Sequence, residues 1–337
     1  MLQRISIQNF KSLKDVTLDL QQVNLLIGPN NSGKTNLLKV LEYFRRAKNI
    51  PPLGTTTTTA YEQETKYANQ HTSQYEKIVY RNAIGEDVKI ELLLDSTPYT
   101  CICTAYIQSI TPANSDFSTS IFRPDPNTFI APQTLSENKI LKDNCSNIAT
   151  FLLSLFSDER EIFESLEQDF HATISDFKRI SVVPENGKLF LRFTDTKGNK
   201  FGADEVSEGV LYFLALLCIV HQPNPPKLLL LEEPERGIHP RRIREVMDFI
   251  FRLAEEKDIQ VIMTSHNENV VNYFSSMPES VFVFDKDEEG ATQVRNLLKD
   301  IIEPSHQNSE RNGVEKIDFT DDLGKNWIYG LLGGVPE

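Results

Sequence analysis

The residues with the clearest chemistry are Gly28–Thr35, which read GPNNSGKT. They match the spacing G-x-x-x-x-G-K-[ST], and they lie between the apolar run VNLLI and an amphipathic helical pattern. Glycines at this spacing let successive backbone N–H groups turn toward phosphate oxygens, and the start of a helix adds the positive end of its dipole. We therefore predict a phosphate-binding loop, with a chance glycine-rich turn as the alternative.

The residues of this loop have separate expected roles. Lys34 should reach the β- and γ-phosphates of a nucleoside triphosphate as a point charge. The Thr35 hydroxyl should coordinate Mg²⁺. The residues expected to contact ATP are Asn30, Asn31, Ser32, Gly33, Lys34 and Thr35.

A second group of reactive side chains follows the leucines at 228–231. Glu232 and Glu233 stand together at the end of this buried-looking strand, where an ionised carboxylate is costly unless a cation pairs with it. A nucleotide fold needs a strand that brings an acid to the metal, so we predict that Glu232 holds Mg²⁺ through a water. Glu233 would orient the attacking water and take its proton. The alternative is that both carboxylates flank a strand end in solvent.

Composition narrows the class of protein. The chain has 337 residues, 39% of them hydrophobic, and a net charge of −13, which argues against general nucleic-acid binding. No apolar run is long enough to span a bilayer, and the N-terminus lacks the apolar region of a signal peptide. The cysteines lack a CxxC spacing, so we expect reduced thiols in a cytoplasmic protein. Arg236, Arg241, Arg242 and Arg244 form either a local basic patch or a solvated helix start.

Hydrophobic periodicity divides the chain into segments of different texture. The two ends alternate between strands and helices, and the middle does not. The expected elements are strands within 1–27, a helix from Thr35, a loop at 48–75, strands within 78–110, a proline-rich loop at 111–137, helices within 138–178, a β-meander turned at Asn186–Gly187 and Lys197–Gly198, a helix after residue 209, a strand after Pro226, a helix at about 240–256, and strands at 259–264 and 281–284.

Five stretches together resemble one family. They are ISIQNFKSLKDVTLDL near the start, ADEVSEG at Ala203–Gly209, EEPERGIHP, TSHN at Thr264–Asn267, and the tail IYGLLGGVPE. With the phosphate loop, they resemble an ABC-type ATPase of the branch shared by RecF, SMC proteins and OLD-family ATPases. The resemblance covers residues 1–45 and 200–337, and the middle only in outline.

The resemblance implies an α/β fold. It would be a P-loop NTPase head of the ABC-ATPase type, with a mixed or parallel central sheet, an antiparallel β subdomain and a helical insertion. Residues 1–45 and 200–337 would form the split ATPase core. Residues 46–199 would form an inserted β and helical lobe with flexible loops.

The resemblance also implies a mechanism. Two heads would dock head to tail and enclose two ATP molecules, and Ser207 and Gly209 of one copy would complete the site of the other. The alternative for Ser207 is an ordinary helix cap. His266 would hydrogen-bond the γ-phosphate or the attacking water, whereas a lone histidine is more often structural.

Other family positions are less defined. His239 would serve the subunit interface, and Phe10 or Lys11 would lie near the adenine. Gln74 and Gln108 are candidates for the glutamine loop. The metal acid is Glu232, where transporter heads usually have Asp, so contact with Mg²⁺ through water is the safer expectation.

The leading functional hypothesis is a stand-alone ATPase that works as a nucleotide switch. It would form a head-to-tail homodimer or higher oligomer, and it would regulate a separate effector such as a nuclease in DNA processing, DNA repair or anti-phage defence. The alternatives are a scaffold that binds ATP with negligible turnover, and a RecF-like ATPase that binds DNA.

Some relatives are disfavoured by what the chain lacks. The middle has no extended heptad pattern for SMC-type arms. An OLD-type nuclease needs a Toprim nuclease domain after the ATPase, and only residues 285–337 follow the last expected strand. Asp285–Gly290 is acidic, but it fits a hairpin turn better than a metal site.

Overall fold

The computed structural model describes residues 1–47, 79, 86–103, 108–111, 121–122, 124–134, 140–223, 225–236 and 238–335. The chain forms two compact units, one of Met1–Thr119 with Phe274–Glu337 and the other of Ser120–Tyr273. None of the described helices is long and apolar enough to cross a membrane.

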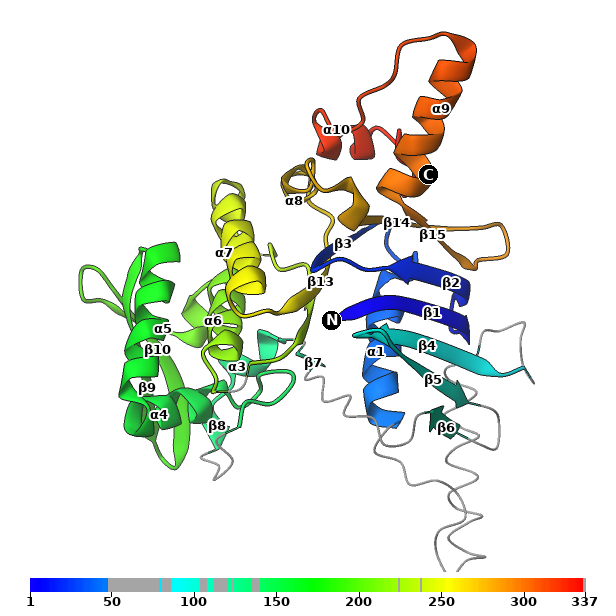
Figure 1. The fold of residues 1–337 in the computed structure, drawn as a ribbon. Coiled ribbons are helices and arrows are strands. Elements are labelled where there is room, and N and C mark those ends of the chain that lie inside the picture. The colour runs from blue at the N-terminus through cyan, green and yellow to red at the C-terminus, as the bar shows by residue number, and fades with distance from the viewer. Residues whose placement is uncertain are drawn as a thin grey trace, which may run out of the picture. The chain divides into compact units, whose positions relative to one another are not determined.

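An antiparallel sheet forms much of the first unit, with the strand order β2-β1-β4-β5-β6. Ile5 and Ile7 are almost fully buried because alternate residues of β1 face the core, and a register shift between Leu2 and Arg4 allows Leu2 to be buried as well. Figure 1 shows helix α1 along this sheet, where Phe10 and Tyr43 pack with ring centroids 5.9 Å apart. The elements are β1 (Leu2–Phe10), β2 (Leu13–Asp19), α1 (Lys34–Ala47), β4 (Val88–Leu94), β5 (Thr97–Cys103) and β6 (Gln108–Thr111).

A second group of strands in this unit lies next to the phosphate loop. Strand β14 (Val281–Lys286) pairs in parallel with β3 (Val23–Ile27) and antiparallel with β15 (Thr292–Asn296). All residues of β3 are buried, as expected for a strand covered on both faces. The chain then continues through a π-helical turn η5 (Leu297–Ile302), α9 (Glu303–Asn312) and α10 (Leu323–Ile328).

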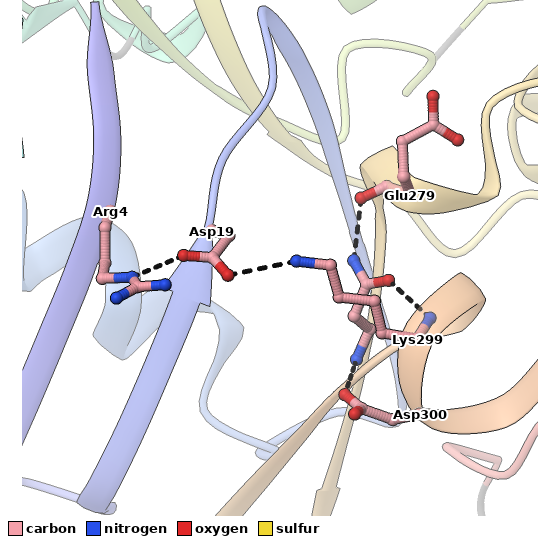
Figure 2. A network of polar contacts seen from close by, with 6 residues as sticks. Arg4, Asp19, Glu279, Lys299 and Asp300 are labelled. Atoms are coloured by element: carbon pink, nitrogen blue, oxygen red, sulfur yellow. Dashed lines mark hydrogen bonds and ion pairs between the residues drawn. The ribbon is translucent and has the colours of Figure 1, made fainter. Parts of the chain in front are cut away.

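Polar contacts connect the antiparallel sheet to the C-terminal segment of the same unit (Figure 2). Asp19 at the end of β2 accepts hydrogen bonds from Arg4 Nε at 2.5 Å and from Lys299 Nζ at 3.1 Å. Asn296 accepts from the Lys299 backbone N–H and donates to the carbonyl oxygen of Glu279. Segments almost the whole chain length apart therefore form one unit.

The second unit contains another antiparallel sheet, in which β9 (Phe177–Glu185) and β11 (Lys200–Gly202) both pair with β10 (Lys188–Asp195). Helices α4 (Ile148–Asp158) and α5 (Arg160–Thr173) pack on it (Figure 1). Phe170 of α5 lies 6.1 Å from the Phe193 ring of β10 and 6.3 Å from the Phe213 ring of α6 (Glu208–Val220). These helices therefore share a core with α6.

Parallel strands carry the reactive residues of this unit. Strand β12 (Leu228–Glu232) pairs in parallel with β13 (Gln260–Thr264) and with β7 (Ile121–Phe122). The leucines of β12 are 0–2% exposed, which confirms the prediction of a fully apolar strand in a parallel arrangement. The strands are followed by α7 (Ile243–Glu256), after the short turn η3 (Pro240–Arg242), and by α8 (Glu268–Tyr273).

Most predicted elements are confirmed, and the turns at Asn186–Gly187 and Lys197–Gly198 lie where expected. The prediction that 111–137 is only loop is wrong for its described part, because β7, α3 (Asn127–Ile130) and β8 (Gln133–Thr134) form there. Buried Phe122 and Phe129 stabilise these short elements despite the prolines. The loop predicted at 48–75 lies outside the described residues.

The sequence-based division into residues 1–45 with 200–337 and residues 46–199 stays a prediction. The two compact units group the chain differently, because α6, β12 and β13 belong to the same unit as α4 and α5. The antiparallel β subdomain and the helical insertion expected from the sequence are both present in the fold.

Candidate functional site

The first group of candidate residues is the loop between β3 and α1, in the first unit. Gly28 and Gly33 have φ angles of 143° and 109°, a region that favours glycine. A Cβ on Gly28 would collide with the backbone oxygen of Phe284. The loop path therefore depends on glycine at both ends of the segment predicted to bind phosphate.

The polar groups of this loop fit an anion. Lys34 is 6% exposed, and its Nζ donates to the carbonyl oxygens of Gly28 at 2.7 Å and Pro29 at 2.8 Å. Ser32 Oγ is buried and has no hydrogen-bond partner among the described residues. Helix α1 begins at Lys34 and has no acidic residue in its first turn, so the positive end of its dipole is not neutralised there. Buried polar atoms normally have a partner, and a phosphate oxygen would supply one.

The remaining predicted ligands of the loop are accessible. Asn30, Asn31 and Thr35 are exposed, and Asn31 has a φ of 68°. No group of three or more His, Cys, Asp or Glu side chains that could hold a metal occurs in the described part of the chain. Mg²⁺ usually binds through one or two protein oxygens together with substrate phosphates and water. The hydroxyl of Thr35 fits such a partial set of ligands.

A second group of candidate residues lies at the ends of β12 and β13, in the second unit. The two strands are in register, so that Glu232 is opposite Thr264. Glu233 has a φ of 46°, and its backbone N–H donates to the carbonyl oxygen of Thr264 at 3.0 Å. A non-glycine residue in this left-handed region is uncommon and costs conformational energy. Neighbouring contacts therefore keep Glu233 in a strained exit from the strand.

Glu233 lies close to the predicted histidine. His266 Nε2 and Glu233 Oε1 are 3.8 Å apart, which is near enough for an electrostatic contact but too long for a hydrogen bond. Their side chains are 34% and 41% exposed, so both remain accessible to solvent. The structure therefore brings Glu232, Glu233 and His266 to one edge of the second unit.

A buried carboxylate lies behind this edge. Glu235 is 8% exposed, and its Oε1 accepts a 2.5 Å hydrogen bond from the Ser265 hydroxyl. Burial raises the pKa of Glu235, and the hydrogen bond from Ser265 partly opposes this rise. Ser265 Oγ also accepts from the Asn267 backbone N–H at 3.0 Å. This contact joins the turn after Glu233 to the segment that carries His266.

The sequence did not predict that Glu235 is buried. The signal was a third carboxylate in EEPE, directly after a proline, but the stretch reads as an exposed turn. Its burial depends on Ser265, which is 30 residues further along the chain.

The predicted signature loop starts helix α6. Ser207 is exposed, and its Oγ accepts from the Val210 backbone N–H at 3.4 Å, so it caps the helix. Gly209 is buried. Glu208 forms an ion pair with Arg236 at 3.3 Å, which connects this loop to the turn after β12.

Other candidate residues have ordinary structural surroundings. Phe10 is buried in the core, and the side chain of His239 accepts from the Arg241 backbone N–H at 3.3 Å. Asp287 closes the turn between β14 and β15 by accepting from the backbone of Glu289 and Ala291, which confirms the predicted hairpin. Burial, and after it the charge of Lys39, lowers the pKa of Lys11. Gln74 lies outside the described residues.

Comparison with known proteins identifies the class. The family profile described as "AAA ATPase domain" matches residues 1–183, which is more than half of the chain. The chain belongs to this AAA ATPase family. A second profile, described as "AAA domain, putative AbiEii toxin, Type IV TA system", matches residues 107–272.

Two curated proteins are similar to this chain. An "ATP/GTP phosphatase" of Helicobacter pylori is 22% identical over 328 residues, which cover 80% of this chain and 86% of that protein. The "Uncharacterized ABC transporter ATP-binding protein YhcH" of Bacillus subtilis is 41% identical over 49 residues. This second match spans only 15% of the Bacillus protein.

Solved structures show the same fold. The SMC head domain from Thermotoga maritima matches with a TM-score of 0.50 and 11% identity, covering 88% of this chain and 98% of that one. An SMC head bound to the C-winged helix domain of ScpA matches with a TM-score of 0.51 and 14% identity, covering 87% and 96%. The chain is therefore a member of the AAA ATPase family, and its α/β fold is similar to that of SMC heads.

Proposed function

We propose that this protein hydrolyses ATP to ADP and phosphate, and that Glu233 and His266 carry the chemical step. The observation that supports hydrolysis, beyond nucleotide binding, is the 3.8 Å approach of His266 to Glu233 at the ends of two parallel strands. Both side chains are partly exposed, so a substrate can reach them.

The residues divide the reaction between them. The loop Gly28–Thr35 binds the triphosphate through its backbone N–H groups, and the Lys34 ammonium moves from the loop carbonyls to the β- and γ-phosphates. Thr35 and Glu232 are the residues that would hold Mg²⁺, Glu232 through a water. The ion would supply positive charge that offsets the negative charge of the phosphates during the reaction.

Glu233 acts on the water that attacks the γ-phosphorus. Its carboxylate orients this water and takes its proton as the new P–O bond forms and the bond to the ADP oxygen breaks. His266 donates a hydrogen bond to the γ-phosphate or to the attacking water. The proton on Glu233 then passes to solvent or to the released phosphate.

We further propose that ATP binding closes a head-to-tail homodimer or a higher oligomer. Ser207 and Gly209 of one copy would complete the nucleotide site of another, since Ser207 offers an exposed hydroxyl at the start of α6 and the acidic residue of its first turn, Glu208, is paired with Arg236. The dimer would act as a nucleotide switch on a separate effector in DNA processing, DNA repair or anti-phage defence. The toxin–antitoxin description of one matching profile and the partner domain on one SMC head support this class of role.

Phosphate release and light scattering test the proposal together. Wild type, Glu233→Gln and Lys34→Ala are compared at equal concentration with ATP and Mg²⁺. Wild type should release phosphate, Glu233→Gln should bind ATP and accumulate as dimer, and Lys34→Ala should do neither. Negligible phosphate release by wild type, unchanged by DNA, would favour the ATP-bound scaffold over the enzyme. DNA affinity that falls steeply with salt would favour a RecF-like role.

A further inference from the structure

The hairpin of β14 and β15 contacts the phosphate loop through a buried threonine. Thr292, the first residue of β15, is 1% exposed. Its Oγ1 lies 2.8 Å from the carbonyl oxygen of Ser32 and 2.7 Å from the Ser12 hydroxyl. Its backbone N–H donates to the Ser12 carbonyl oxygen at 2.7 Å. One residue therefore joins the turn between β1 and β2 to the loop that precedes α1.

Hydrogen-bonding chemistry determines the order of this chain of contacts. A carbonyl oxygen can only accept, so the Thr292 hydroxyl donates to Ser32 and its oxygen accepts from the Ser12 hydroxyl. Ser12 Oγ in turn accepts from Asn36 Nδ2 at 2.9 Å. The contacts run from helix α1 through Ser12 and Thr292 to the backbone of the phosphate loop.

The bond to Ser32 also orients the next backbone N–H. A trans peptide unit is planar, so its carbonyl and its N–H point in opposite directions. When the Ser32 carbonyl points toward Thr292, the Gly33 N–H must point away from Thr292. No described residue accepts a hydrogen bond from this N–H. A phosphate oxygen is a suitable acceptor on that side.

Gly33 shows how close this contact is. A Cβ on Gly33 would collide with Thr292 Oγ1. Glycine is therefore required at position 33 by its φ of 109° and also by the close approach of Thr292.

The other end of the phosphate loop is contacted by the C-terminal tail. The Gly334 N–H donates to Asp285 Oδ2 at 3.2 Å, and its carbonyl oxygen accepts from Trp327 Nε1 at 3.2 Å. A Cβ on Gly334 would lie 2.6 Å from Val283 Cγ1 and 3.4 Å from the Gly28 Cα. Gly334 has a φ of 66°. The tail thus packs directly on the first glycine of the loop.

We propose that residues 283–334 position the phosphate loop at both ends, with Thr292 and Gly334 as positioning residues for nucleotide binding. Thr292 orients the Ser32–Gly33 peptide, and Gly334 supports the loop at Gly28. Neither residue needs to touch the nucleotide. The inference rests on the proposed binding of ATP by this loop.

The test removes one hydroxyl while keeping the shape of the side chain. Binding of a fluorescent ATP analogue with Mg²⁺ is measured on the full chain for wild type, Thr292→Val and Thr292→Ser. We expect Thr292→Val to raise Kd about tenfold, as for the loss of one hydrogen bond near 1.4 kcal/mol. Thr292→Ser keeps the donor and should restore affinity to near the wild-type value.

Thr150→Val is the matched control. Thr150 is 3% exposed, and its hydroxyl has no partner among the described residues, so this variant removes a buried hydroxyl without breaking a contact. It should bind the analogue like wild type. Thermal unfolding of each variant shows whether it is folded at the assay temperature.

The outcomes separate the two proposals. If wild type does not bind the analogue, nucleotide binding itself is wrong. If wild type binds and folded Thr292→Val binds equally well, or if Thr292→Ser is as weak as Thr292→Val, the positioning role of Thr292 is wrong. In steady-state turnover, Thr292→Val should raise KM for ATP and leave kcat nearly unchanged, because the loop binds ground state and transition state alike.

Gly334→Ala tests the other end independently. The added methyl group must move the tail, Val283 or the loop, so we expect weaker binding of the analogue. Gly313→Ala is the comparison, since Gly313 has a similar φ of 65° but a Cβ there meets nothing within 4 Å. Equal affinity of both folded variants would overturn the role of Gly334.

Discussion

The Ser265 hydroxyl donates a 2.5 Å hydrogen bond to the carboxylate of Glu235, and both groups are buried. Glu235 is two residues after Glu233 and Ser265 directly precedes His266, so the contact joins the two segments that carry the proposed catalytic residues. Burial makes the charged form of Glu235 costly, and this cost raises its pKa above the ordinary 4.5.

This raised pKa predicts a pH-dependent contribution to stability. Glu235 binds its proton more tightly in the folded state than in the unfolded state. Its favourable contribution to the free energy of unfolding is therefore complete below pH 4.5 and is lost as pH rises through the folded pKa. Glu235→Gln keeps the size and removes the charge. The variant should gain stability relative to wild type as pH rises from 4.5 through the folded pKa. Urea unfolding at several pH values measures the difference, and a difference independent of pH would contradict the prediction.

Removing the charge of Glu233 should separate chemistry from binding. A positioned general base contributes about 10²- to 10⁴-fold to rate, so Glu233→Gln should lower kcat by that order with little change in ATP affinity. His266→Ala should also lower kcat, while Asn267→Ala beside it serves as the control. Phosphate release under saturating ATP provides the measurement. Unchanged kcat in Glu233→Gln would assign the base elsewhere.

The sequence predicted the parts of the site that depend on local patterns. The spacing of Gly28, Gly33 and Lys34 determines a loop between a strand and a helix, and the leucines of β12 indicate a buried strand that ends at Glu232. These features need only a few neighbouring residues, so periodicity and motif spacing detect them.

The parts that it missed depend on contacts between distant residues. Thr292 and Ser12 are 280 positions apart, and nothing near Thr292 in the sequence marks it as a neighbour of the phosphate loop. The buried state of Glu235 likewise depends on Ser265 in another strand connection. The elements between 121 and 134 were missed because buried Phe122 and Phe129 outweigh the local proline signal.

Ser207 has a structural role that can be separated from its proposed role between subunits. As an N-cap it contributes about 1 kcal/mol, so Ser207→Ala should lower the free energy of unfolding by that order. Ser207→Asp retains a capping side chain but adds negative charge where the phosphate of the second copy would lie. It should be as stable as wild type and fail to form the ATP-dependent dimer. The test is light scattering, with ATP, of a protein that carries Ser207→Asp together with Glu233→Gln. Normal dimerisation of this protein would exclude the role of Ser207 between subunits.

The ion pairs of Asp19 predict how acid and salt affect the first unit. Hydrogen bonds and charge from Arg4 and Lys299 lower the pKa of Asp19 below 3.8, although burial acts in the opposite direction. Its contribution to stability is therefore present above pH 3.8 and lost as pH falls through the folded pKa.

Asp19→Asn should lower Tm at pH 7 in low salt, and the difference should shrink in 1 M salt because the pairs are largely exposed. Lys14→Ala, which removes an exposed pair with Glu289 on the β14–β15 turn, is the comparison and should have a smaller effect. A Tm difference for Asp19→Asn that is unaffected by salt would show that shape, and not charge, makes Asp19 stabilising.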